Sequence, residues 1–268
     1  MNTIVRESVE SGSRPGDLRI AAVGDLHFDG SIPKIEELQV VLHEAARTAD
    51  ILLLCGDLTT HGQPGEIAAF VRELQSFEGH VIAVLGNHDH ESDCAPMLED
   101  MLSESGVHVL EGAAVTLGNV GFAGVKGFGG GFGKGRIEPF GERALKTFVE
   151  IAIEEADRLD AALATLETPV KVVLTHYAPI VETLHGEPEY LWPFLGSSRL
   201  MHTIDKHGAA VAFHGHAHYG SPSGRTAAGI PIHNVSLPVL RTALKQHLRI
   251  WTPGRAVASS STRLAQEA

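Results

Sequence analysis

The chain has 268 residues, 43% of them hydrophobic, and carries a formal net charge of −12 at pH 7. This length and hydrophobic content favour one domain with a substantial core over two small ones. The acidic balance and the lack of any block of consecutive basic residues argue against nucleic acid as a general partner.

The sequence also bears on the cellular compartment. Its apolar runs fall well short of the roughly 20 residues that a membrane-spanning helix needs, and the polar first 17 residues do not resemble a secretory signal. Only two cysteines occur, Cys55 and Cys94, as is typical of a reducing compartment. We therefore expect a cytoplasmic protein with no membrane partner, and a homo-oligomer is left open.

Strand-sized apolar runs alternate with amphipathic stretches in the first third of the chain. Residues 1–17 show no periodicity and are expected to form a flexible N-terminal extension. The pattern then predicts strand 18–23, helix 34–48, strand 51–55, helix 65–77 and strand 80–85. Such alternation is typical of βαβ units and a parallel sheet.

The remainder of the chain continues as a mixture of helices and strands. The same criteria predict helices at 94–105, 142–166 and 200–206 and strands at 107–110, 113–117, 120–125, 170–175, 209–213, 230–235 and 246–251. The glycine-rich segment Gly127–Gly135 fits neither a P-loop nor a dinucleotide-binding spacing, so we expect a flexible surface loop or a lid bordering a site. A single domain is thus expected over residues 18–252, with a flexible C-terminal tail over 253–268.

Five of the predicted strands are followed at once by side chains of the types that commonly bind metals. They are Asp25 and His27, Asp57, Asn87 and His88, His176, and His214 and His216. Ligands in open α/β sheets bind beyond the carboxyl ends of the strands, and unpaired imidazoles and carboxylates are costly to bury. Carboxylate, amide and imidazole ligands without thiolates suit manganese, iron or zinc. Because the set exceeds what one ion needs, we expect two ions that share a bridging carboxylate.

In their order and spacing, these motifs resemble the calcineurin-like metallophosphoesterase superfamily. The matching segments are Gly24-Asp25-Leu26-His27, Gly56-Asp57, Gly86-Asn87-His88-Asp89, His176 and His214-Gly215-His216. The resemblance covers roughly residues 18–235, and the short bacterial members most similar in size and motif spacing include class III cyclic-nucleotide phosphodiesterases. One position departs from the family pattern, because Phe213 rather than glycine precedes His214.

The resemblance implies a fold and a ligand set. The fold would be a four-layer α/β/β/α sandwich, in which two mixed β-sheets are flanked by helices and two manganese, iron or zinc ions lie at the strand ends. Asp25, His27 and His216 would bind one ion. Asn87, His176 and His214 would bind the other, and Asp57 would bridge the two ions.

The resemblance also implies catalytic roles for two further residues. His88 would contact the phosphate and help to protonate the leaving oxygen, and Asp89 would orient His88. The family pattern gives no ligand role to His61, His90 or His218, which lie close to the motifs in the sequence.

The implied reaction is hydrolysis of a small phosphate ester by metal-activated hydroxide. We expect a phosphodiesterase, with cyclic nucleotides as candidate substrates; the alternatives are a phosphomonoesterase or nucleotide pyrophosphatase and, remotely, a metal-free protein-binding scaffold. A scaffold would have no need of seven intact ligands. The irregular segment 177–199 is expected to set specificity, since Trp192 or Tyr190 could stack on a nucleobase or simply pack the loop onto the sheet.

Overall fold

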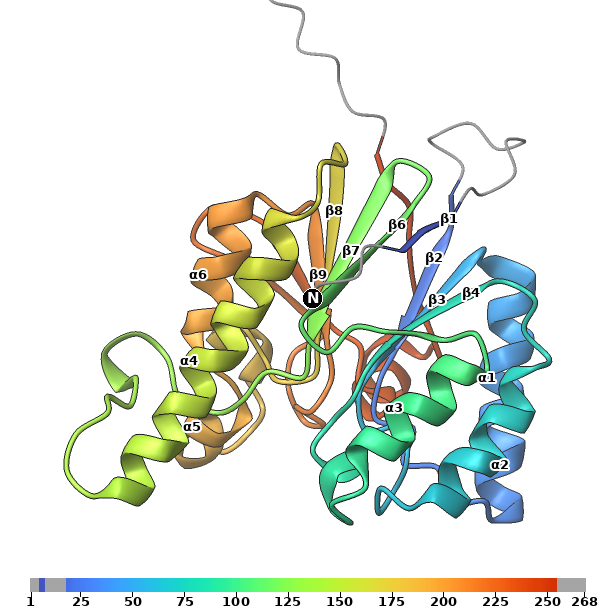
Figure 1. Cartoon of the computed structure of the whole chain (residues 1–268), viewed down its shortest axis with the longest axis horizontal. Helices are drawn as coiled ribbons and strands as arrows, with labels where there is room; N and C mark the ends of the chain where they lie inside the picture. Colours follow the sequence, from blue (N-terminus) through green and yellow to red (C-terminus); the bar gives the residue numbers. More distant parts are fainter. Residues whose placement is uncertain (1–4, 8–17, 255–268) are drawn as a thin grey trace, which may run out of the picture.

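Two β-sheets face each other between two groups of helices, as Figure 1 shows. The computed structural model describes residues 5–7 and 18–254. One sheet is covered by α1 (Ile32–Thr48), α2 (Pro64–Leu74) and α3 (Ala95–Glu104), and the other by α4 (Arg143–Ala164) and α6 (Ser198–His207). The expected four-layer α/β/β/α sandwich of two mixed sheets is confirmed.

The five-stranded sheet comes mostly from the first half of the chain. Its spatial order is β12 (Arg249–Trp251), β2 (Ile20–Val23), β3 (Ile51–Cys55), β4 (His80–Val84) and β5 (His108–Val109). Strands β2 to β5 run parallel, whereas β12 is antiparallel to β2. Helices α1, α2 and α3 connect the parallel strands, so the carboxyl ends of β2, β3 and β4 lie at one edge of the sheet.

The seven-stranded sheet is built mainly from the second half. Its spatial order is β1 (Val5–Glu7), β6 (Ala113–Leu117), β7 (Val120–Val125), β8 (Val170–Thr175), β9 (Val211–His214), β11 (Pro231–Asn234) and β10 (Ser223–Arg225). Strands β7, β8, β9 and β11 run parallel, and β6 and β10 are antiparallel to their neighbours β7 and β11. The three-residue strands β1 and β10 are not among the predicted elements, because so short a segment shows no hydrophobic period.

The two sheets enclose the main core. Successive side chains of β8 alternate between its two faces: Val172 and Leu174 belong to the cluster between the sheets, whereas Val173 belongs to the cluster beneath α4 and α6. All three are fully buried. Both faces of β8 are therefore apolar, which explains why its sequence is a continuous rather than an alternating hydrophobic run.

The helix ends follow familiar signals. Pro33 lies in the first turn of α1, Gln63 and Glu66 form a reciprocal capping box at the start of α2, and Gly208 ends α6 in the left-handed conformation. The predicted helices accordingly agree with the observed ones to within a few residues.

Short helical turns occupy the connections. They are η1 (His88–His90), η2 (Gly133–Gly135), η3 (Val181–Leu184), η4 (Glu189–Leu191), α5 (Trp192–Leu195), α7 (Leu237–Val239) and η5 (Leu240–Leu244). The segment 177–199, which the sequence predicted to be irregular, thus contains three such turns between β8 and α6.

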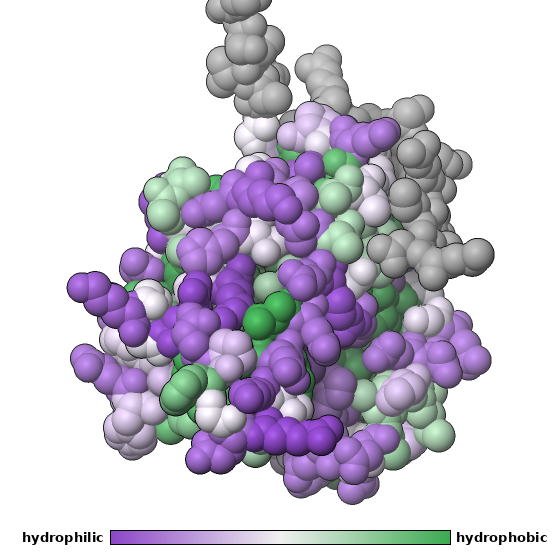
Figure 2. All heavy atoms as spheres, turned by 60° about the vertical axis from the view of Figure 1, so that its left-hand side comes forward, coloured by the Kyte–Doolittle hydropathy of each residue, from purple (hydrophilic) through white to green (hydrophobic). Residues whose placement is uncertain are grey.

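The exterior is mostly polar on the face seen in Figure 2, where apolar side chains show only in small patches. None of the helices within residues 18–254 is long and apolar enough to cross a lipid bilayer. Apart from β1 and residues 253–254, the predicted N-terminal extension and C-terminal tail lie outside the described residues.

Candidate metal centre

The predicted ligand residues lie on loops and strand ends where the two sheets meet. The Gly24 backbone N–H donates to the Val235 carbonyl at 2.8 Å, and Nδ1 of His176 lies 2.9 Å from the Cys55 carbonyl oxygen. Each contact joins a residue of one sheet's edge to a residue of the other's. The carboxyl ends of β2, β3, β4, β8 and β9 therefore converge on one site.

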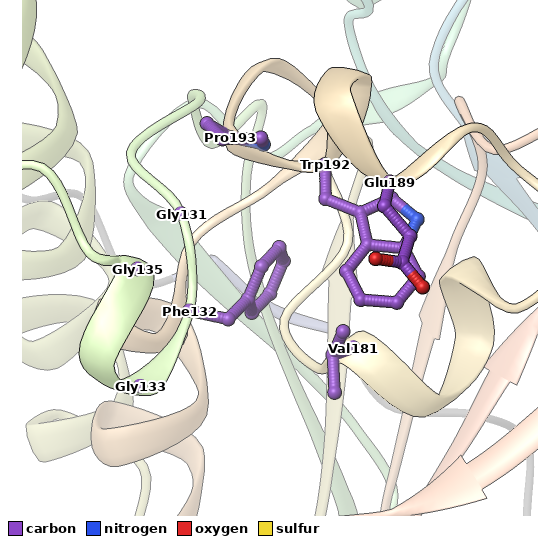
Figure 3. Close-up of a pocket in the computed structure, with 8 residues that line it drawn as sticks. All are labelled: Gly131, Phe132, Gly133, Gly135, Val181, Glu189, Trp192 and Pro193. Atoms are coloured by element: carbon purple, nitrogen blue, oxygen red, sulfur yellow. The ribbon is translucent and has the colours of Figure 1, made fainter.

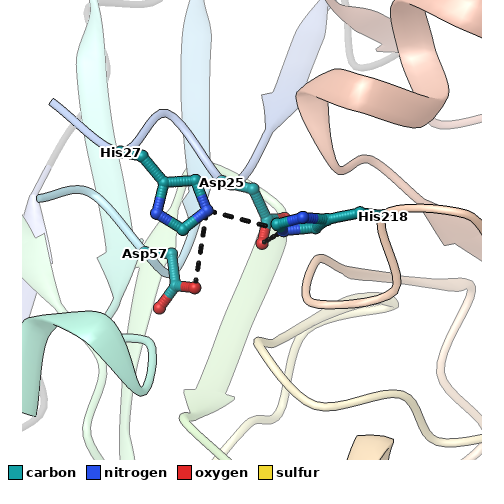
Figure 4. A group of neighbouring side chains, drawn as sticks. All are labelled: Asp25, His27, Asp57 and His218. Carbon is teal, nitrogen blue, oxygen red and sulfur yellow. Dashed lines mark hydrogen bonds and ion pairs between the residues drawn. The ribbon is translucent and has the colours of Figure 1, made fainter. Parts of the chain in front are cut away.

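A first group of donor side chains comprises Asp25, His27, Asp57 and His218 (Figure 4). One donor atom of each lies within 4.8 Å of the others. Nε2 of His218 is 2.8 Å from Oδ1 of Asp25 and 3.5 Å from Nε2 of His27. The same nitrogen of His27 lies 3.8 Å from Oδ2 of Asp57. Two buried carboxylates and two imidazoles thus surround one small volume.

A second group shares Asp57 with the first and adds His176 and His216. Nε2 of His176 lies 3.4 Å from Oδ1 of Asp57 and 3.0 Å from Oδ1 of Asn87. The rings of His176 and His216 are 4.8 Å apart between centroids. Asp57 therefore directs one carboxylate oxygen toward each group, which is the geometry expected of a bridging ligand.

The backbone is strained at these positions. Within the described residues, six non-glycine residues have positive φ, and four of them are Asp25 (58°), His27 (45°), Asp57 (49°) and His216 (67°). Such conformations cost about 1–3 kcal/mol each and persist where the surroundings enforce them, typically at functional sites. These backbone conformations turn the four side chains toward the two groups of donors.

Two glycines allow the loops to approach the carboxylates. A Cβ atom on Gly86 would lie 2.1 Å from Oδ1 of Asp57, and one on Gly215 would lie 2.3 Å from Oδ2 of Asp25. Both distances are far below a van der Waals contact. Any larger residue at either position would displace a donor carboxylate, so these motif glycines are required by packing.

The two imidazoles of the second group have pKa values shifted in opposite directions. Burial lowers the pKa of His216 to about 3, which keeps that ring neutral with a free lone pair. Burial also opposes protonation of His176, but the Asp57 and Asp25 carboxylates outweigh it and raise the pKa of His176 to about 9. Conversely, burial favours protonation of Asp57, yet His176 and the His88 backbone N–H hold the pKa of Asp57 well below its usual range.

The structure brings His214 into neither group, unlike the expectation for the last motif. His214 is the final residue of β9 and is fully buried, with Nδ1 2.7 Å from the Gly215 carbonyl oxygen and Nε2 2.8 Å from Oγ1 of Thr183. Both ring nitrogens are thus engaged inside the protein. His218 takes part instead, so the two histidines turned toward the site are His216 and His218.

A sequence signal for this register was available. The family pattern has glycine before its first histidine, and Phe213 breaks that rule for His214. Gly215 satisfies it for His216, in the order Gly215-His216-Ala217-His218. Shifting the motif by two residues removes the departure and selects the histidines that the geometry brings together.

Asp89 was expected to orient His88, but the structure shows no hydrogen bond between their side chains among the described residues. Nδ1 of His88 lies 2.8 Å from the Thr60 carbonyl oxygen, so Thr60 rather than Asp89 fixes this ring. Asp89 is fully buried and accepts hydrogen bonds from the backbone N–H groups of Leu58, Thr59 and Gly86 and from the Thr59 hydroxyl, all within 3.1 Å. It therefore joins the loop after β3 to the loop after β4, which is a positioning role for the neighbouring site residues.

The donor set is chemically suited to transition-metal ions. It combines the carboxylates of Asp25 and Asp57 with several imidazoles and contains no thiolate. Buried carboxylates need a compensating positive charge, and oxygen and imidazole donors together suit manganese, iron and zinc. Two groups of donors that share one carboxylate fit a pair of such ions.

The family model for calcineurin-like phosphoesterases matches residues 18–220. The chain belongs to this family. Members of the family are metal-dependent phosphoester hydrolases that use dinuclear metal centres, and the two groups of donors lie where such a centre would be held. A comparison with curated proteins gave no match.

Solved structures with the same fold include two bacterial proteins. Phosphopantetheinyl hydrolase (PptH) from Mycobacterium tuberculosis has a TM-score of 0.66 and 16% identity, and the match covers 90% of this chain and 98% of that one. The protein TT1561 of Thermus thermophilus has a TM-score of 0.50 and 16% identity, over 88% of this chain and 98% of that one. At such identities the likeness shows the fold alone.

Proposed function

We propose that this member of the family is a dinuclear-metal phosphodiesterase for a small phosphate ester. The observation that carries the proposal is the position of Asp57, whose two carboxylate oxygens face separate groups of donors. One ion would be held by Asp25, His27 and His218, the other by Asn87, His176 and His216, with Asp57 between them. When bound, two such cations would neutralise the phosphoryl oxygens and lower the pKa of a nearby water from about 15.7 toward neutrality.

The tautomer of His176 is fixed by the fold. The Cys55 carbonyl can only accept a hydrogen bond, so Nδ1 of His176 is the protonated nitrogen and donates to it. Nε2, which faces Asp57 and Asn87, is then left with a lone pair when the ring is neutral. A carbonyl partner on the distal nitrogen both orients a ligand histidine and increases its basicity.

His88 is the proposed proton donor to the leaving oxygen. Nδ1 donates to the Thr60 carbonyl, which leaves Nε2 as the nitrogen available to a substrate. The ring packs edge-on against His27 with 4.6 Å between centroids, so it borders the first group of donors without belonging to it.

The charges around the site support a diester over a monoester. In the part of the chain that the structure describes, no lysine or arginine side chain is hydrogen-bonded or ion-paired to the side chains of the proposed ligands. A monoester dianion needs more positive charge than a diester monoanion. Lys126 is largely buried and its charge interacts with that of Asp57 without an ion pair, so the positive charge of the site would come from two cations and one lysine, for which we favour the monoanion.

A paired assay tests the proposed reaction. The manganese-loaded protein is expected to hydrolyse bis(p-nitrophenyl) phosphate faster than p-nitrophenyl phosphate, and chelation is expected to abolish both activities. Release of p-nitrophenolate at 405 nm is the readout, with metal content measured on the same sample. Faster cleavage of the monoester would instead identify a phosphomonoesterase, and a protein that binds no metal would overturn the enzyme proposal.

Replacing His88 should separate metal binding from rate. His88→Ala is expected to keep two metals per chain and to lower kcat for the diester by roughly 100- to 10,000-fold, the usual contribution of a positioned general acid. His202→Ala, at an exposed histidine of α6, is the matched control. Loss of metal from His88→Ala, or an unchanged kcat, would contradict the role given to His88.

A further inference from the structure

A pocket of about 290 Å³ lies between the glycine-rich segment and the segment that follows β8 (Figure 3). It is lined by Gly131, Phe132, Gly133, Gly135, Val181, Glu189, Trp192 and Pro193. Phe132 and Trp192 lie on two sides of it, and Val181 lies beside Trp192. The walls are apolar, and Glu189 supplies the one charged side chain among the lining residues.

Backbone hydrogen bonds fix the glycine-rich wall to the opposite segment. The N–H groups of Gly130 and Gly131 donate to the carbonyls of Pro193 and Gly196 at 2.7 and 2.9 Å. The Ser198 N–H returns a bond to the Gly131 carbonyl at 3.1 Å. A segment that the sequence predicted to be a flexible loop or a lid is thus anchored along one side of the pocket.

The Trp192 wall is held in place as well. Its indole N–H donates to the Glu187 carbonyl at 3.2 Å, and its ring lies 5.9 Å from that of His185. The indole face is therefore presented in a fixed orientation. A pre-formed apolar cavity with one or few polar groups is the usual form of a small-molecule site, and this volume suits one ring system.

The pocket adjoins the proposed metal ligands. Ala217, between His216 and His218 in the sequence, is fully buried in a small cluster against which Phe132 and Trp192 pack. On the pocket's rim, Pro193 is followed by Phe194, whose carbonyl oxygen lies 3.4 Å from Nε2 of His216. These contacts connect two walls of the pocket to the loop that carries His216 and His218.

We infer that this pocket receives an uncharged aromatic ester group of the substrate, held between Phe132 and Trp192. The inference rests on the proposed function, because it assigns a subsite to that reaction. Aromatic side chains on two sides of the pocket favour a flat apolar group, and the Glu189 carboxylate disfavours a second anionic group beside it. Phe132 and Trp192 are accordingly specificity residues, distinct from the groups that carry the chemistry.

Binding of 2-naphthylmethanol tests the pocket without relying on turnover. The chain has two tryptophans, so Trp251→Phe leaves Trp192 as the single indole reporter. In that background the alcohol should quench the fluorescence, and Phe132→Ala should raise its Kd about five- to tenfold. Phe132→Leu keeps apolar bulk without the ring and should give an intermediate Kd. Phe140→Ala, at an exposed aromatic residue that does not line the pocket, is the matched control and should leave the Kd unchanged.

Inhibition kinetics connect the pocket to the reaction. With the manganese-loaded protein, 2-naphthylmethanol should inhibit bis(p-nitrophenyl) phosphate hydrolysis competitively, with a Ki that matches the Kd and rises equally in Phe132→Ala. Hydrolysis without competitive inhibition, or a Kd indifferent to both Phe132 variants, would overturn the subsite and leave the proposed function standing. No diester hydrolysis by the unmodified chain would overturn the proposed function, and the subsite with it.

Discussion

Asp57→Asn is expected to reduce diester hydrolysis by roughly 1,000-fold or more. The two oxygens of Asp57 face separate groups of donors, 3.8 Å from Nε2 of His27 and 3.4 Å from Nε2 of His176. An amide has one oxygen acceptor and no negative charge, so it cannot bridge two cations. Each ion contributes several kcal/mol of charge stabilisation in the transition state, and each step of about 1.4 kcal/mol is a tenfold change in rate.

Metal analysis should accompany the rate measurement for this variant. Asp57→Asn is expected to retain fewer than two metals per chain after gel filtration, whereas Asp100→Asn, at an exposed carboxylate of α3, should match the unmodified protein in both rate and metal content. Two retained metals with a normal rate in Asp57→Asn would refute the bridging role.

Much of the architecture can be predicted from local patterns. Helix α4 and strands such as β3 and β7 follow directly from hydrophobic periodicity, because each is long or apolar enough to show its period. The convergence of polar residues at the strand ends also follows, since parallel strands place their carboxyl ends at one edge. That reasoning predicts from the sequence that Asp25, Asp57 and His176 lie in one site.

Side-chain direction at the ends of strands is harder to predict. Whether a residue just after a strand points into the site depends on local backbone conformation, and Asp25, Asp57 and His216 all adopt positive φ. The sequence does not state where the strand stops and this conformation begins. His214 is still part of β9 and points into the protein, whereas His216, two residues later, faces the metal site.

The role of Asp89 exposes a similar limit. Adjacency in sequence suggested that it orients His88, but its carboxylate accepts hydrogen bonds from three backbone N–H groups and a hydroxyl on two different loops. Those partners come from residues 58, 59 and 86, and only the fold brings the first two to it. Motif adjacency therefore indicates that Asp89 matters to the site without indicating what it holds.

The register of the last motif can be decided by replacing two histidines in parallel. His218→Ala removes a donor 2.8 Å from Oδ1 of Asp25 and should weaken metal binding by at least about 100-fold, the upper range for loss of an outer-sphere partner. Hydrolysis should fall with it. His214→Ala should leave two metals bound, because both nitrogens of His214 already have partners inside the protein.

The two variants should rank in the opposite order when stability is measured, with His214→Ala the more strongly affected. His214→Ala removes the contact with the Thr183 hydroxyl, which keeps its hydrogen bond to the Ile180 carbonyl, and opens a cavity at a fully buried position. This change should cost about 1–3 kcal/mol and lower the Tm. His218 is only partly buried, so His218→Ala should change the Tm of the metal-free protein much less. If only His214→Ala lost its metal and its activity, the register that the sequence first indicated would be the right one. A histidine whose replacement abolishes metal binding must face the ions.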